Sequence, residues 1–347
     1  MYQVNGFDEQ LLEQYLTEHI EGFSGPITLE KFKGGQSNPT YKVTTPNATY
    51  VLRKQPAGKL LKSAHAVDRE YKVMAALAKT DVPVPKMHHL CEDTSIIGTI
   101  FVVMEYLEGQ IHWNAALEKV SSNALRSKMY QQMNQVMANL HNVDIDSVGL
   151  ADYGPKGGYF ERQYSRWTKQ YKASELEPIA AMDKLIAWLG ENLPEDDGQV
   201  CLVHGDFRLD NMMFNEDGEI IGLLDWELST LGHPYADLAY QCMQLRMPQN
   251  TGVMDGLAGM NRAALGIPTE AEYVQSYCDK RGIDGIDNWV FYLAFSFFRL
   301  AAIAQGVAKR AAMGNASSEQ ANKVAGFVYP LAKQALGIIE SQQQTTC

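Results

Sequence analysis

The sequence predicts an α+β protein in which a small β-rich domain precedes a large helical domain. Up to about residue 107, most segments are short runs of strand-forming residues bounded by turn residues. After Gly109, long segments with apolar residues at helical spacing take over. A chain of 347 residues is long enough for two such parts. We therefore expect domains at residues 1–107 and 108–347.

Each expected element follows from its own local pattern. In the first domain, we expect one helix at Ala64–Lys79 and strands at Ile27–Lys33, Thr40–Thr44, Thr49–Gln55 and Thr99–Leu107. In the second domain, we expect helices at Asn123–Asn142, Tyr159–Lys172, Ile179–Glu191 and Trp289–Met313. A short β-rich island at Val200–Trp226 interrupts the helical domain.

Composition and charge exclude several classes of protein. A net charge of −11 argues against nucleic-acid binding, which requires clustered positive charge. The five cysteines are far apart and form no C-x-x-C pair, as expected for free thiols in a reducing compartment. The amino terminus lacks the basic-then-apolar pattern of a secretion signal, so we expect a cytoplasmic protein.

One apolar segment, Trp289–Ala308, is long enough to be mistaken for a membrane span. Arg299 interrupts it near the middle, which favours a buried helix of the second domain over a membrane helix. We expect an acidic residue of the same domain to pair with Arg299. We expect no contact with a membrane. The sequence contains no signal for any particular oligomeric state.

The stretch His204–Asp225 carries the clearest chemical signal. Asp206 and Asn211 follow an apolar strand, and the turn Asn215–Gly218 predicts a hairpin that returns Asp225 beside Asn211. Amide and carboxylate oxygens in such a cluster suit Mg²⁺ that is bound together with substrate phosphates. Phosphoryl transfer needs metal ligands of this kind and an oriented nucleophile. We therefore expect Asn211 and Asp225 to bind Mg²⁺ and Asp206 to accept the proton of a substrate hydroxyl.

This stretch resembles the catalytic loop and metal-binding aspartate of the protein-kinase-like fold. It begins His-Gly-Asp rather than His-Arg-Asp, a form typical of aminoglycoside, choline and homoserine kinases. The continuation LDWELSTLGHPYADLA, from Leu224 to Ala239, is very similar to the aminoglycoside phosphotransferase and choline kinase-like family. The resemblance is strongest to the kinase domains that accompany acyl-CoA dehydrogenases. It implies a small β-rich N-lobe, a large helical C-lobe, and ATP and Mg²⁺ as cofactors.

The same resemblance assigns roles to neighbouring residues. It implies that His204 is structural and that Asp237 is the buried aspartate that braces the catalytic loop. Glu227 stands where protein kinases have glycine, and it is a candidate contact to the metal or to the acceptor. Only eleven residues separate Asp225 from Asp237. This leaves no room for the peptide-docking segment of protein kinases, so we expect a small-molecule acceptor.

The first domain offers a candidate cover for the nucleotide phosphates. Gly34, Gly35, Ser37 and Asn38 lie in a turn between two expected strands. Backbone N–H groups in such a turn can face anionic oxygens. A two-glycine turn is common in proteins of many kinds. Its position before the strand that carries Arg53 is what favours a role in phosphate binding.

That strand supplies the expected phosphate-binding cation. By resemblance to protein kinases, Arg53 occupies the place of their phosphate-contacting lysine, and Lys54 on the opposite strand face is the alternative. On the following helix, Glu70 lies at the edge of an apolar stripe formed by Val67, Tyr71, Met74 and Ala78. A carboxylate on the packed side of a helix needs a partner, and Arg53 is the expected one. Farther along, Glu105 and Leu107 resemble the hinge whose backbone holds adenine.

The expected acceptor site lies in the helical domain. Arg162, Arg166 and Lys169 recur at helical spacing and make one helix face basic, and Trp167 lies on an adjacent face. Such a face attracts an anionic acceptor and repels a polycationic aminoglycoside. An ordinary solvated helix face explains the same pattern, so both interpretations stay open. Arg299 is the other candidate for the acceptor site, with its pairing to an acidic residue of the same domain as the favoured interpretation.

Together these features predict an ATP-dependent kinase that phosphorylates a hydroxyl group of a small metabolite, with a hydroxyacyl-CoA as one acceptor class. An aminoglycoside or amino-alcohol kinase is the second interpretation. A nucleotide-binding pseudokinase is the third, and the intact Asp206, Asn211 and Asp225 argue against it. The sequence does not distinguish ATP from GTP.

Overall fold

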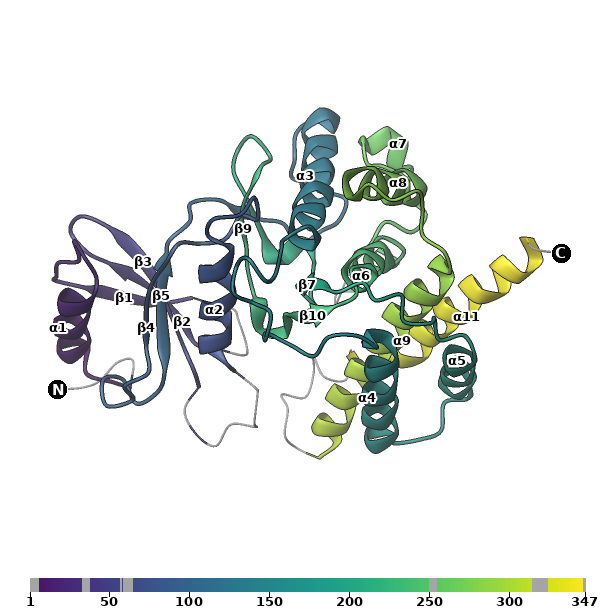
Figure 1. Ribbon diagram of the computed structural model, residues 1–347, viewed down its shortest axis with the longest axis horizontal. Helices are drawn as coiled ribbons and strands as arrows, with labels where there is room; N and C mark the ends of the chain where they lie inside the picture. Colours follow the sequence, from purple (N-terminus) through teal and green to yellow (C-terminus); the bar gives the residue numbers. More distant parts are fainter. Residues whose placement is uncertain are drawn as a thin grey trace. The chain divides into compact units, whose positions relative to one another are not determined.

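The computed structural model describes residues 6–32, 38–56, 58, 65–249, 255–313 and 324–345, with side chains up to residue 342. The chain forms two compact units (Figure 1). One comprises Met1–Ile111, Asp146–Leu150 and Asp210–Ser229, and the other comprises His112–Ile145, Ala151–Leu209 and Thr230–Cys347. The domain boundary expected after residue 107 stays a prediction, since these units divide the chain after Ile111 and assign Asp210–Ser229 to the first unit.

The first unit contains a five-stranded antiparallel sheet in the order β1-β2-β3-β5-β4. Its strands are β1 (Thr28–Lys31), β2 (Thr40–Thr44), β3 (Thr49–Lys54), β4 (Met87–Cys91) and β5 (Phe101–Glu105). Four of them are the expected strands. Strand β4 was not expected, because two histidines in its centre interrupt the alternation that marks a strand.

Alternation along β3 divides the sheet into two faces. Tyr50 and Leu52 are buried on one face, where they share a core with Val103 of β5 and with helix α1. Val51 and Arg53 point to the other face, which helix α2 (Val67–Leu77) covers (Figure 1). This division determines which side chains of β3 can meet α2.

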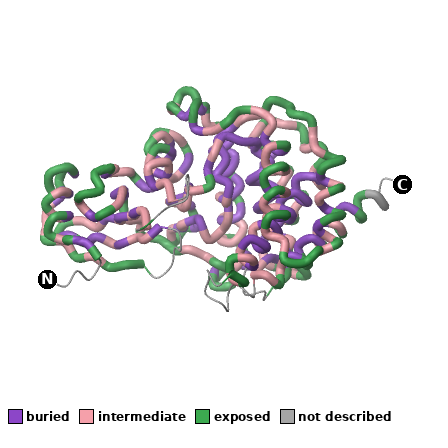
Figure 2. Tube along the Cα trace, turned by 90° about the horizontal axis from the view of Figure 1, so that it is seen from below, coloured by how far each residue is buried: buried purple, intermediate pink, exposed green. Residues whose placement is uncertain are grey.

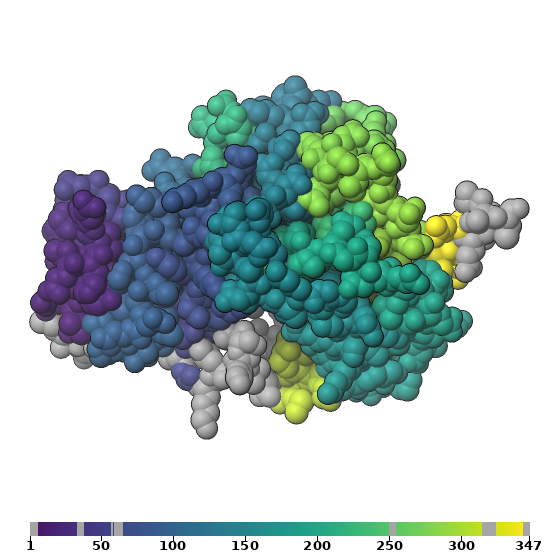
Figure 3. All heavy atoms as spheres, viewed as in Figure 1, coloured from purple at the N-terminus to yellow at the C-terminus, as the bar shows by residue number. Residues whose placement is uncertain are grey.

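Helix α1 (Glu9–His19) was not expected, because its polar residues dilute the apolar pattern. Its start is nevertheless encoded locally: the Asp8 side chain accepts hydrogen bonds from the amides of Gln10 and Leu11, at 2.9 and 3.2 Å. Leu12 and Leu16 are fully buried against the sheet. Helix α1, purple in Figure 3, therefore forms part of the packed first unit.

Helix α2 buries a different stripe from the expected one. The buried residues are Val67, Glu70, Val73, Met74 and Leu77. Glu70 therefore lies in the middle of the packed face and not at its edge. The expected stripe included Tyr71, which is half-buried, and Ala78, which is exposed and ends the helix.

The hairpin expected within the β-rich island is present. Strands β8 (Met212–Phe214) and β9 (Ile220–Leu223) pair antiparallel, and β6 (Gln110–Ile111) pairs with β8. The Gly218 amide donates to the Asn215 carbonyl across the turn at 3.1 Å. The short helical turns η1 (Leu209–Asn211) and η2 (Trp226–Leu228) flank the hairpin.

The second unit is mainly helical, and most of its core surrounds α9 (Trp289–Ala312), which packs against α4, α5, α6 and α11. Figure 2 shows buried residues concentrated inside this unit and exposed residues on its outer surface. The other elements are α3 (Asn123–His141), α4 (Tyr159–Ser174), α5 (Ala180–Glu191), α6 (Tyr235–Leu245), α7 (Arg262–Leu265), α8 (Glu270–Arg281), α11 (Val328–Thr345) and the antiparallel pair β7 (Cys201–Val203) and β10 (Thr230–Gly232).

Helix α9 is long and apolar enough to cross a membrane by length and composition, but 78% of its most apolar window is buried inside the protein. It is the core helix that the position of Arg299 predicted. Its neighbours supply the apolar environment that a membrane would otherwise provide.

We expect the substitution Asp8→Ala to lower the free energy of unfolding by about 1 kcal/mol, because two amides at the start of α1 lose their acceptor. Chemical denaturation followed by circular dichroism measures the change. The control is Thr17→Ala on the same helix, whose exposed hydroxyl bonds only the Glu13 carbonyl, and which should shift stability by less than about 0.5 kcal/mol. Equal losses in the two variants would contradict the role of the cap.

Candidate active site

In the first unit, Arg53 on β3 joins two carboxylates. Its Nε lies 3.0 Å from Oε2 of Glu70 on α2, and its Nη2 lies 3.0 Å from Oδ1 of Asp225. The Asn38 side chain, itself buried, donates to Oε1 of Glu70 at 3.0 Å. The ion pair expected between Arg53 and Glu70 is therefore present, and its role toward a nucleotide stays a prediction.

Lys54, the alternative cation, points to the opposite face of β3. Its ammonium lies over the ring of Phe7, 5.3 Å from the ring centre, and burial lowers the pKa of Lys54. Strand alternation thus separates the two cations, and the structure brings only Arg53 to the α2 face.

Among the described residues, three carboxylates contribute to the electrostatics of Arg53. Burial opposes the charge on Arg53, but the carboxylates of Glu70, Asp225 and Glu227 outweigh it and raise its pKa. Burial likewise raises the pKa of Glu70 to about 7, and the charges of Asp225 and Glu227 add to this effect against the opposing charge of Arg53. One guanidinium therefore faces three carboxylates, an arrangement that favours the binding of a further cation.

The hairpin positions both candidate metal ligands within the first unit. The Leu224 amide donates to the Asn211 carbonyl at 2.8 Å, so the backbone before Asp225 is bonded to that of Asn211. Asp225 has a left-handed backbone with φ of 64°, a conformation that is strained for a residue other than glycine. Trp226, fully buried, fixes this turn by donating from its indole nitrogen to the Leu223 carbonyl at 2.8 Å.

The remaining candidates of the first unit are the residues of the Gly34–Asn38 turn and of the expected hinge. Gly34, Gly35 and Ser37 lie outside the described residues. Glu105 is exposed, and its carboxylate accepts from the Lys86 amide at 3.1 Å. Leu107 packs against Gly222 of β9 so closely that a Cβ at Gly222 would come within 2.4 Å of it.

In the second unit, the buried carboxylate of Asp237 holds the start of the predicted catalytic loop. It accepts from the amides of His204 and Gly205 at 2.7 and 2.9 Å. The ring of His141 reaches the same carboxylate at 3.3 Å. Burial opposes the charge on Asp237, but its contacts with His141 and His204 outweigh burial and hold its pKa below the ordinary value.

His141 completes this brace as a neutral ring. Burial lowers the pKa of His141, despite the opposing effect of Asp237. Since a carboxylate only accepts, Nε2 carries the proton toward Asp237, and Nδ1 accepts from the Tyr277 hydroxyl at 2.7 Å. The brace therefore extends from the loop through α3 to α8.

Asp206, the expected proton acceptor, has charged and polar neighbours within the second unit. Its side-chain Oδ1 lies 3.4 Å from Nε of Arg208. Burial, together with the neighbouring Asp206 carboxylate, raises the pKa of Tyr240 on α6. The Asp206 amide donates to Nδ1 of His204 at 3.3 Å. Both the backbone and the side chain of this residue are thus oriented by neighbouring groups.

The acceptor candidates on α4 differ in their surroundings. Arg162 donates to the Pro155 carbonyl at 3.1 Å, whereas Arg166 and Lys169 are exposed. Trp167 is buried with 8% exposure, and the guanidinium of Arg166 lies 5.3 Å from its ring. Trp167 is therefore mainly a packing residue of α4, and the exposed basic face consists of Arg166 and Lys169.

Arg299 does not have the expected carboxylate partner among the described residues. Its Nη2 donates to the Gly205 carbonyl at 2.6 Å. Its guanidinium lies over the rings of Tyr240 and Trp167, 5.2 and 5.8 Å from their centres. A carbonyl and two aromatic rings accommodate its charge instead of an acidic residue.

Tyr240 and His141 were not among the expected site residues. Tyr240 follows Asp237 by three residues on α6, so helical spacing could have placed it beside the same loop. His141 gave no local signal, because its partners are remote in sequence. Arg208 could have been found from its position two residues after Asp206.

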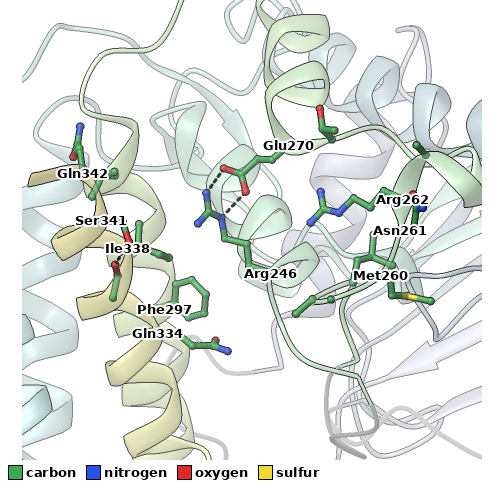
Figure 4. Close-up of a pocket in the computed structure, with 17 residues that line it drawn as sticks. Arg246, Met260, Asn261, Arg262, Glu270, Phe297, Gln334, Ile338, Ser341 and Gln342 are labelled. Atoms are coloured by element: carbon green, nitrogen blue, oxygen red, sulfur yellow. Dashed lines mark hydrogen bonds and ion pairs between the residues drawn. The ribbon is translucent and has the colours of Figure 1, made fainter. Parts of the chain in front are cut away.

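A cavity of about 970 Å³ lies in the second unit between α9, α11 and the segment around α7 (Figure 4). Arg246 and Glu270 form a two-bond ion pair on its wall, at 2.5 and 2.7 Å, and Phe297 and Ile338 supply apolar surface. The described residues that line this cavity include none of the candidate site residues.

A braced His-Gly-Asp loop, a two-lobe fold and an ion-paired strand cation define a phosphotransferase of the protein-kinase-like class. The model of the phosphotransferase enzyme family matches residues 28–273, and the chain belongs to this family. The fold class expected from the sequence and its assignment to a phosphotransferase family are thereby confirmed.

Proteins of known sequence extend this result. Acyl-CoA dehydrogenase family member 10 of Mus musculus is 46% identical over 329 residues, which cover 94% of this chain and 31% of that protein. Acyl-CoA dehydrogenase family member 11 of Rattus norvegicus is 45% identical over 336 residues, which cover 95% of this chain and 43% of that protein. The chain therefore spans less than half the length of these relatives.

Solved structures show the same fold. A protein of Ralstonia eutropha JMP134, provisionally named an aminoglycoside phosphotransferase, is 47% identical with a TM-score of 0.89, covering 96% of this chain and 99% of that chain. The aminoglycoside phosphotransferase APH(4)-Ia, in a ternary complex with AMP-PNP and hygromycin B, is 14% identical with a TM-score of 0.60, covering 94% of this chain and 98% of that chain. At this low identity the second likeness concerns the fold alone.

We expect the substitution Glu70→Gln to remove a pH dependence of stability. Because the pKa of Glu70 is raised from 4.5 to about 7, the folded protein holds a proton that the unfolded chain releases in this interval. The free energy of unfolding therefore falls as pH rises from 4.5 to 7, by up to about 3 kcal/mol from this residue. Urea denaturation across this range measures the difference between the two proteins. Parallel pH profiles would contradict the raised pKa.

Proposed function

We propose that this protein is an ATP- and Mg²⁺-dependent kinase that transfers the γ-phosphoryl group to a hydroxyl of a small anionic metabolite, with hydroxyacyl-CoA as the acceptor class. Family membership supports the phosphotransferase part. The identities of the nucleotide, the metal and the acceptor are inferred from the residues around Asp206, Arg53 and α4.

The observation that carries the proposal is the setting of Asp206. Its carboxylate is 20% exposed, in contact with Tyr240 and Arg208, on a loop whose backbone is fixed by Asp237. A fixed, accessible carboxylate can accept the proton of an alcohol as its oxygen attacks phosphorus. Precise orientation of this group lowers the cost of reaching the reactive geometry.

The residues around Arg53 support phosphate and metal binding. Arg53 is the cation proposed to contact phosphate oxygens, with Glu70 holding its guanidinium. Asn211 and Asp225 offer one amide and one carboxylate oxygen, a donor set that suits Mg²⁺ completed by phosphates and water. Among the described residues, no group of three or more histidine, cysteine, aspartate or glutamate side chains could hold a metal ion. When bound, Mg²⁺ would neutralise part of the negative charge of the phosphates.

The basic face of α4 and the named relatives support the acceptor class. Arg166 and Lys169 are exposed on a chain whose net charge is −11, so they stand out as a surface for an anionic group. The mouse and rat relatives are named as acyl-CoA dehydrogenase family members, which points to acyl-CoA chemistry. A second candidate acceptor is an aminoglycoside, favoured by the name of the Ralstonia relative.

We expect phosphate transfer from ATP with Mg²⁺ to hydroxyacyl-CoA esters and no transfer to amino alcohols or aminoglycosides. The assay is mass-spectrometric detection of the phosphorylated acceptor across a panel of these three classes, with GTP as a competing donor. Transfer to the amino compounds alone would overturn the acceptor proposal. Nucleotide binding without transfer to any acceptor would favour a binding protein instead.

In the same assay, Asp206→Asn should lower kcat by about 10²- to 10⁴-fold, because the amide cannot accept the proton. The matched control is Asp217→Asn, the same change at an exposed position of the β8–β9 turn, which should leave kcat unchanged. Turnover that survives Asp206→Asn would show that another group accepts the proton.

A further inference from the structure

We propose that Arg299 is a positioning residue for phosphoryl transfer, which fixes the peptide unit that carries Asp206. The inference rests on the proposed role of Asp206 as proton acceptor, and it assigns a function to a residue of the core helix α9.

Asp237 holds only the peptide groups that precede Gly205. It accepts from the amides of His204 and Gly205, so the orientation of those two peptide groups is set by one buried carboxylate. Neither bond restrains the next peptide group, which consists of the Gly205 carbonyl and the Asp206 amide. That peptide group leads directly to the proposed catalytic residue.

Gly205 has more intrinsic backbone freedom than a residue with a Cβ. It has a φ of 81°, in the left-handed region that glycine adopts without strain. Because glycine has no Cβ, rotation about its ψ angle meets few steric barriers. Such a rotation would turn the following peptide plane and displace the Asp206 carboxylate with it.

Arg299 restrains that rotation from the carbonyl side. Its Nη2 donates to the Gly205 carbonyl at 2.6 Å, a short bond of the charge-assisted kind. On the other side of the same peptide plane, the Asp206 amide donates to Nδ1 of His204 at 3.3 Å. The peptide group is therefore held at both of its polar atoms, and the bond from Arg299 is the shorter one.

The guanidinium of Arg299 is itself fixed by two rings. It lies over Tyr240 of α6 and Trp167 of α4, so three helices determine its position. Tyr240 is also a neighbour of the Asp206 carboxylate, whose charge adds to burial in raising the pKa of Tyr240. The ring that supports the guanidinium thus belongs to a residue beside the catalytic side chain, which couples the backbone and side-chain restraints on Asp206.

The test compares Arg299→Met and Arg299→Lys with the wild-type enzyme in steady-state kinetics. We expect Arg299→Met to lower kcat by about 10- to 100-fold, because a misplaced catalytic group costs a factor of this size. The KM for ATP should change by less than about threefold, since the nucleotide contacts are unaltered. Arg299→Lys retains a cation and one donor without the planar guanidinium, so it should recover part of the lost kcat.

Arg246→Met is the matched control for a loss of stability. It removes an arginine of the same unit that is bonded to Glu270 rather than to the loop. Thermal unfolding is measured for every variant, and kcat is expressed per folded molecule. We expect Arg246→Met to lower the melting temperature and to leave kcat unchanged.

Each result bears on one of the two proposals. If Asp206→Asn abolishes transfer but Arg299→Met retains wild-type kcat, the positioning role is wrong and the proposed function stands. Equal losses of kcat in Arg299→Met and Arg246→Met at equal folded fraction would also overturn the positioning role. A wild-type enzyme that transfers phosphate to no acceptor and to no water molecule would overturn both proposals.

Discussion

The helical unit depends on one buried carboxylate, that of Asp237. With 1% exposure, this charge has almost no contact with water, and an uncompensated charge in such a place would destabilise the fold. Two consecutive backbone amides and the His141 ring compensate it. These donors lie at the end of β7 and on α3. The charge of Asp237 and the backbone conformation of the loop therefore stabilise each other.

In the first unit, charge is balanced differently. Three carboxylates surround Arg53, and burial keeps water from screening their repulsion. Burial and the charges of Asp225 and Glu227 raise the pKa of Glu70, so that Glu70 binds a proton more readily. The bound proton reduces the repulsion among the three carboxylates. A divalent ion bound by Asp225 would reduce the same repulsion more strongly, because it carries two positive charges. Proton binding at Glu70 and metal binding at Asp225 should therefore oppose each other.

Much of the fold followed from the sequence because the relevant signals are local. The alternation along Thr49–Lys54 identified the strand and placed Arg53 and Lys54 on opposite faces, and the resemblance to kinases then favoured Arg53. The Asn215–Gly218 turn identified the hairpin that returns Asp225. In contrast, the phase of α2 was misjudged, because a helical stripe with a glutamate in its centre violates the apolar pattern. Only the tertiary contact with Arg53 makes that glutamate tolerable.

The site was predictable where residue type and spacing determine chemistry, and unpredictable where a contact joins distant helices. Asp206, Asn211 and Asp225 belong to one continuous pattern. The contact of Arg299 with the Gly205 carbonyl joins residues 94 apart in sequence, and nothing in the apolar segment around Arg299 specifies a carbonyl rather than an acid as its partner. Likewise, the burial of Trp167 depends on α9 and could not be read from the face of α4 alone.

The left-handed backbone of Asp225 has a consequence for the evolution and engineering of this enzyme. Glycine at this position would relieve the backbone strain, and it would also remove a repulsive neighbour of Glu70. Glycine would at the same time remove the ion pair between Asp225 and Arg53. Backbone strain therefore favours losing the very side chain proposed to bind the metal, and only this ion pair opposes the loss. A library selected only for thermal resistance would tend to accumulate inactive proteins at this codon, so any stabilisation campaign needs a simultaneous selection for turnover.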